Sequence, residues 1–213
     1  MPSPIVWNTR NDGVIEVSTD GEHYTVPALS GAELVSMRRM LGHEAIVKEI
    51  ARRFDVPVAW VMGIGRHESG GDPRAVNPEK LPGEEDDGVG LLQITGALKG
   101  RHTNQELFDP RLNLTIGVGL IASIYKVAFD LPAVCSMFNA GQPCITPDNR
   151  VVPCRNAPPG SRPSHRPWQN EAWLANGRTP KCCSRWGFAC SPGHIDSVVR
   201  GSNWYILNHG ANA

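Results

Sequence analysis

Most of the sequence between residues 30 and 141 has the spacing of amphipathic helices, with apolar side chains recurring every three or four residues. Start and stop signals divide this stretch: Ser30 and Glu33 have the spacing of a capping box, and Gly42 and Gly70 follow apolar patterns. We expect Asp55 to cap the helix that follows it. These signals predict helices over residues 30–42, 43–54, 57–69, 113–129 and 130–141.

Two further segments have clear signals. Val14 to Val17 and Tyr24 to Val26 are short β-prone runs on either side of Asp20-Gly21, which is a strong hairpin turn signal. Ser191-Pro192 begins a last helix, whose inward residues are expected to be Ile195, Val198, Val199 and Trp204. We interpret residues 1–42 as an N-terminal hairpin and helix extension, and residues 43–213 as the main domain.

Composition excludes several classes of protein. The chain has 21 basic and 21 acidic residues and a net charge of zero, which argues against binding nucleic acid or anionic lipid by charge alone. The 40% hydrophobic and 20% charged content is ordinary for a globular protein. The longest run without strongly polar side chains, Thr115 to Tyr125, has about half of the roughly 20 residues that a membrane span requires. We therefore expect no membrane span.

Residues 142–191 interrupt the main domain with a different composition. This region and the two residues after it hold half of the 18 prolines and every cysteine except Cys135, with almost no periodicity. We expect an irregular insertion held by disulfides, by buried packing or by a metal, although the missing C-x2-C spacing makes zinc the weakest of the three. Adjacent Cys182 and Cys183 should pair with different partners among Cys135, Cys144, Cys154 and Cys190. Trp168, Trp173 and Trp186 either extend a binding groove or pack within the insertion.

One acidic residue is placed unusually. Glu68 ends the helix over residues 57–69, on the face that carries Val61, Ile64 and Gly65. Burial on that apolar face would raise the pKa of the carboxyl group, which a group needs if it is to hold a proton at neutral pH. The alternative is a glutamate at a frayed helix end that points into water.

Four segments decide in favour of the buried carboxyl group. In order, they are HESGGDPRAVNP (67–78), GVGLLQIT (88–95), FDPRLNLTIG (108–117) and MFNAG (137–141). Together they resemble the soluble lytic transglycosylase family of the goose-type lysozyme superfamily, over about residues 43–141 and again near 192–206.

The resemblance implies a mainly α-helical, lysozyme-like fold with a groove for peptidoglycan glycan strands. It implies cleavage of the β-1,4 bond between N-acetylmuramic acid and N-acetylglucosamine, with Glu68 acting first as acid and then as base to form a 1,6-anhydro end. Ser69, Gln93 and Asn139 match substrate-side positions, and Gly90 and Gly141 match positions of close backbone approach. No metal or cofactor is expected, because proton transfer and an intramolecular nucleophile suffice.

Two positions depart from the family pattern. Phe138 replaces the tyrosine of the YNAG-like turn, and His194 stands where many members have a second tyrosine near the glutamate. His194 could keep that tyrosine's hydrogen bond and would make the protonation of the site depend on pH near 6 to 7. The alternative is a solvent-exposed histidine at a helix start.

Other functions stay open at this point. Glu79, Glu84, Glu85, Asp86 and Asp87 form an acidic loop that could supply a second carboxylate for hydrolysis, or could be a solvated tip. A non-catalytic wall-binding or structural module is the third possibility.

The expected place of action is the cell wall or periplasm. The first residues, MPSPIVWNTR, lack the features of a signal peptide. We expect delivery in a phage particle, through a holin-type hole or by a specialised secretion machine. The expected partners are glycan strands and, through residues 1–42, other virion or secretion proteins.

Overall fold

The computed structural model describes residues 6–19, 22–77, 88–140, 143–154, 157–164 and 191–210. The fold is mainly helical, as expected. Its helices are α1 (Gly31–Leu41), α2 (Glu44–Arg53), α3 (Val58–Ser69), α4 (Asn104–Leu107), α5 (Pro110–Ala128), α6 (Leu131–Ala140) and α9 (Ser191–His209), with a 3-10 turn η1 (Gly96–Leu98). Within the described ranges, no helix has the length and apolar character needed to cross a membrane.

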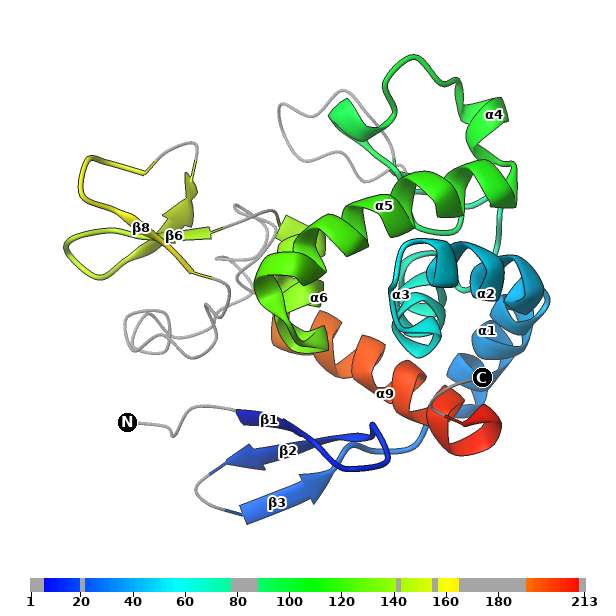
Figure 1. The fold of residues 1–213 in the computed structure, drawn as a ribbon, viewed down its shortest axis with the longest axis horizontal. Helices are drawn as coiled ribbons and strands as arrows, with labels where there is room; N and C mark the ends of the chain where they lie inside the picture. The colour runs from blue at the N-terminus through cyan, green and yellow to red at the C-terminus, as the bar shows by residue number, and fades with distance from the viewer. Residues whose placement is uncertain are drawn as a thin grey trace.

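Helix α3 lies in the middle of the helical domain. Figure 1 shows α1 and α2 on one side of it, α5 above, α6 on the other side and α9 below. All residues of α3 from Val58 to Arg66 are buried except Trp60. The backbones of α3 and α9 approach closely, because a Cβ atom at Gly63 would lie 2.6 Å from the carbonyl oxygen of Val198.

Local signals set most helix ends correctly. The capping box of α1 is present, with Ser30 accepting a hydrogen bond from Glu33. The expected cap at Asp55 is wrong: Asp55 has a φ of 56° and ends α2, while Val56 N donates to Ala51 O over 2.9 Å. Aspartate tolerates this left-handed conformation, so it completes a helix C-terminus here.

Helix α5 begins earlier than the apolar pattern indicated. Its first residue is Pro110 rather than Asn113, because Asp109 accepts a hydrogen bond from Leu112 N over 2.8 Å and Pro110 fits the first turn. The short α4 was not predicted, although Thr103 and Glu106 form a capping box there.

The N-terminal hairpin is confirmed and has a third strand. Strand β2 (Ile15–Thr19) pairs antiparallel with β3 (Glu22–Thr25) and, on its other edge, with β1 (Val6–Thr9). The turn at Asp20-Gly21 lies outside the described residues. The sheet joins the helical core, because Asn203 of α9 accepts a hydrogen bond from Ile15 N at 2.9 Å and donates one to Ile15 O at 2.8 Å.

The proline-rich region is partly regular, which differs from the expected irregular insertion. Strands β6 (Pro143–Ile145), β7 (Val151–Pro153) and β8 (Arg162–Pro163) form a small antiparallel sheet in the order β7-β6-β8. Very short strands in proline-rich sequence leave no detectable alternation. A two-stranded ribbon of β4 (Val76–Asn77) and β5 (Gly88–Val89) likewise escaped prediction.

A disulfide crosses this small sheet. Cys144 bonds to Cys154, whereas Cys135 is a free, buried thiol. Cys144 and Cys154 had been expected among the possible partners of Cys182 and Cys183. That expectation is wrong for these two cysteines, because the β6–β7 hairpin brings them together and they bond to each other. The residues from 165 to 190, with their cysteines and tryptophans, lie outside the described part of the chain.

Candidate functional site

Glu68 lies in the last turn of α3 and is largely enclosed. Its side chain is 17% exposed, so the alternative of a glutamate in open water is wrong. Burial raises the pKa of Glu68 to about 7. Helix α3 ends at Gly70, and the Ser69 hydroxyl donates to Gly65 O over 3.0 Å and accepts from Gly71 N over 3.2 Å. Ser69 thus fixes the backbone that carries the carboxyl group.

His194 comes to Glu68 from the first turn of α9. Its Nε2 lies 3.8 Å from Oε1 of Glu68, and its side chain is 9% exposed, so it is not a solvent-exposed histidine. Burial lowers the pKa of His194 to about 3, with a smaller contribution from His67. The expected titration of His194 near pH 6 to 7 is therefore wrong, because desolvation penalises the imidazolium form. Glu68 is the group that titrates near neutrality.

Helix α6 brings a third segment to the glutamate. The thiol of Cys135 is buried, and its pKa is raised by burial and by the nearby charge of Glu68. Asn139 lies four residues later, so it shares that face of α6, and its side chain is exposed. The adjacent Phe138 packs against the core. Gly141 lies outside the described residues.

The GLLQ segment forms a tight loop between β5 and η1. Gln93 has a φ of 46°, and its side-chain amide donates to Gly90 O over 2.9 Å and to Ala75 O over 3.3 Å. Gly90 has a φ of 76°, and a Cβ atom there would lie 2.2 Å from Nδ2 of Asn113. The amide nitrogen of Gln93 is thus engaged by backbone carbonyl groups of its own loop and of the residue before β4.

Asn113 holds this loop in place, a role that sequence analysis did not assign. It is fully buried, accepts from Leu92 N over 2.9 Å, and donates to Val89 O over 2.8 Å and to Leu107 O over 3.0 Å. The FDPRLNLTIG segment contained the signal for this role. Asn113 is a polar residue in the first turn of an apolar helix, and such a residue needs hydrogen-bond partners when it is buried.

The family model described as "Transglycosylase SLT domain" matches residues 45–154, more than half of the chain. The chain belongs to the transglycosylase SLT domain family. Among solved structures, the crystal structure of the 70 kDa soluble lytic transglycosylase of Escherichia coli matches with a TM-score of 0.50 and 18% identity. The match covers 79% of this chain and 25% of that one, and at this identity it shows the fold alone. A search of curated proteins finds no match.

A second histidine, His67, lies next to Glu68 in this SLT domain and contacts the ring of His194. The rings of His67 and His194 are 4.3 Å apart between centroids and nearly perpendicular, at 76°. Burial lowers the pKa of His67 to about 4, and the cations Arg66 and Arg200 lower it further. Both imidazoles are therefore neutral around neutral pH, and neither supplies a positive charge that would lower the pKa of Glu68.

An ion-pair cluster fixes α3 and α9 of the SLT domain next to these histidines. Arg66 is 4% exposed, and it pairs with Glu33 of α1 over 3.4 Å and donates to the Ser197 hydroxyl over 2.6 Å. Arg200 also reaches Glu33, over 2.8 Å. Arg66 of α3 thus bonds directly to Ser197 of α9, and Glu33 bridges Arg66 and Arg200, so the cluster links the two helices.

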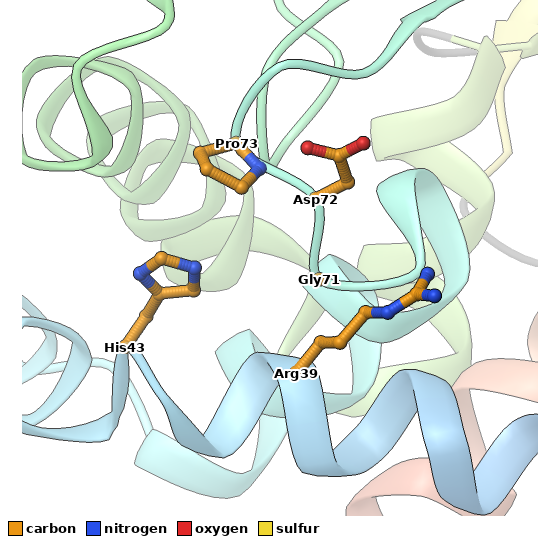
Figure 2. A pocket seen from close by; sticks show the side chains of 5 residues that line it. All are labelled: Arg39, His43, Gly71, Asp72 and Pro73. Atoms are coloured by element: carbon orange, nitrogen blue, oxygen red, sulfur yellow. The ribbon is translucent and has the colours of Figure 1, made fainter.

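The SLT domain also has an open pocket of about 390 Å³ between α1, the start of α2 and the residues that follow α3. Figure 2 shows Arg39, in the last turn of α1, and His43, at the N-cap of α2, near Gly71, Asp72 and Pro73, which follow α3. None of the predicted site residues lines this pocket.

Proposed function

We propose that the chain is a peptidoglycan lytic transglycosylase that cleaves the bond between N-acetylmuramic acid and N-acetylglucosamine. The observation that carries this proposal is the enclosed carboxyl group of Glu68, whose pKa of about 7 leaves it substantially protonated at neutral pH. Membership of the SLT domain family supports the substrate class.

The proposed reaction uses Glu68 twice. Its carboxyl group donates a proton to the glycosidic oxygen, and the bond from that oxygen to C1 of the muramic sugar breaks. The resulting carboxylate then takes the proton of the muramic 6-hydroxyl as its oxygen bonds to C1. Glu68 ends protonated again, no water is consumed, and the product carries a 1,6-anhydro end. The pH dependence follows: activity falls as pH rises through about 7, because Glu68 loses the proton that it donates.

Burial raises the pKa of Glu68, and no charged carboxylate in the described part of the chain contributes to the shift. This supports a mechanism with a single acid. The acidic loop, Glu79 to Asp87, lies outside the described residues, so hydrolysis with a second carboxylate stays the alternative outcome. Ser69, Gly90, Gln93, Asn139 and His194 stay proposed substrate-side positions.

Purified sacculi test the proposal directly. We would incubate them with the wild-type protein, Glu68→Gln and the surface control Glu49→Gln, and identify the product ends by mass spectrometry. We expect 1,6-anhydro ends, lighter than reducing ends by one water, from the wild type and the control. Loss of the acid should lower the rate by about 10²–10⁴-fold. Reducing ends would establish hydrolysis instead, and undiminished clearance by Glu68→Gln would establish a non-catalytic role for that residue.

The proposed place of action is the cell wall. Delivery by a phage particle remains a prediction, and so does tethering through residues 1–42. Detection of the protein in purified particles would support delivery by a phage particle, and its absence from them would leave lysis from within the cell or secretion.

A further inference from the structure

Three side chains at the junction of α3 and α9 have the composition of a metal site. One ligand atom each from His67, Glu68 and His194 can be chosen so that all three lie within 4.8 Å of one another. Two imidazole nitrogens and one carboxylate oxygen form a donor set that suits Zn²⁺. Sites of this kind use three protein ligands and leave a fourth position for water.

A second observation indicates a ligand at this place. The side chain of His194 is more than nine-tenths buried, and its Nε2 has no hydrogen-bond partner among the residues that the structure describes. That nitrogen lies 3.8 Å from Oε1 of Glu68, beyond hydrogen-bond distance. Buried polar atoms nearly always have a partner, so an unpartnered nitrogen beside a carboxyl oxygen requires an explanation.

We propose that His67, Glu68 and His194 bind one Zn²⁺ ion, and that the bound ion inhibits the enzyme. The inhibitory part of this proposal rests on the proposed function of Glu68 as the acid; the binding part does not. On binding, the carboxyl group of Glu68 releases its proton to solvent and its oxygen bonds to the ion. Glu68 then has no proton to donate to a glycosidic oxygen, so glycan cleavage stops until the ion leaves.

The distances need only a modest adjustment. With metal–ligand bonds of about 2.0–2.1 Å, tetrahedral ligand atoms lie about 3.3 Å apart. The Nε2–Oε1 distance of 3.8 Å is close to this value, and the ligand atoms, which all lie within 4.8 Å of one another, would approach further by side-chain rotation. The Arg66 and Arg200 pairs with Glu33 keep the backbones of α3 and α9 together while the side chains rotate.

Calorimetry with Zn²⁺ alone tests binding without any glycan. Accessible thiols are first alkylated, because Cys182, Cys183 and Cys190 lie outside the described residues and thiolates also bind zinc. We would compare the wild type with His194→Phe, His67→Phe and the exposed-histidine control His102→Phe. We expect one ion per chain for the wild type and the control. Removing a residue that only hydrogen-bonds to a metal ligand lowers metal affinity by roughly 10–100-fold. Each cluster variant removes a ligand itself, so its Zn²⁺ affinity should fall by at least this factor.

Circular dichroism shows whether each variant folds. His67 and His194 come from different helices, so if one of the two variants does not fold, the other still tests the site. Equal Zn²⁺ affinity in a folded cluster variant and the wild type would overturn the proposal, as would failure of the wild type to bind one ion.

A second measurement follows sacculus clearance with added Zn²⁺ and then with a chelator. We expect inhibition that the chelator reverses; clearance unaffected by saturating Zn²⁺ would overturn the inhibitory role. A protein that binds Zn²⁺ but clears no sacculi even without it would refute the proposed function and leave the metal site standing.

Discussion

Replacing Glu68 by glutamine keeps the shape of the side chain and removes its charge, so it isolates the free energy of burying the carboxylate. The pKa of Glu68 is about 7 in the folded chain, against an ordinary value of 4.5. Below pH 4.5 the group is protonated in both the folded and the unfolded states, so no charge is buried and the free energy of unfolding is not lowered. Between pH 4.5 and 7 the unfolded chain ionises first, so the wild type loses stability as pH rises.

The magnitude follows from the same two values. At about 1.4 kcal/mol for each pH unit, the wild type should lose about 3 kcal/mol relative to Glu68→Gln between pH 4.5 and pH 8, with no further change above that. This figure is an upper estimate, because the 17% exposure of the side chain lets water relieve part of the cost.

The assay is denaturant unfolding of both proteins at a series of pH values from 4 to 8.5. The matched control is Glu49→Gln, because Arg111 holds the pKa of Glu49 below its ordinary value. There the sign is reversed: Glu49 contributes stability above its ordinary pKa, so Glu49→Gln should be the less stable protein at high pH. A difference between wild type and Glu68→Gln that does not change with pH would refute the claim that Glu68 is held in a desolvated site.

Two further predictions concern the loop that adjoins the site. Asn113→Ala should lower the free energy of unfolding by about 3 kcal/mol, at roughly 1 kcal/mol for each of three buried hydrogen bonds, as measured by urea unfolding; a loss below about 1 kcal/mol would contradict the role assigned to Asn113. Gly117→Ala should cost about 1–3 kcal/mol, because its Cβ would lie 2.4 Å from Leu92, whereas Gly119→Ala should be neutral or stabilising by up to about 1 kcal/mol, since its Cβ meets only Phe54 at 3.6 Å. Thermal unfolding of the two variants checks this contrast, and equal effects would count against it.

The predictions that succeeded depend on neighbouring residues. A capping box needs only Ser30 and Glu33, and an apolar face needs only residues three or four apart, so helix boundaries could be found without knowing the fold. The error at Asp55 has the same origin, because one aspartate can begin the next helix or end the previous one. Packing decides between the two.

The sequence by itself indicated every described α-helix except α4 and placed Glu68 at the end of an apolar face. The family resemblance placed His194 near that carboxyl group, but only the tertiary structure gave the 3.8 Å separation and the burial that keeps the imidazole neutral. The physical reason is that helix propensity and capping are local, whereas a pKa depends on the water excluded by every element packed around the group. The three hydrogen bonds of Asn113 are likewise a property of packing: the residue is visible in the sequence, and its partners are not.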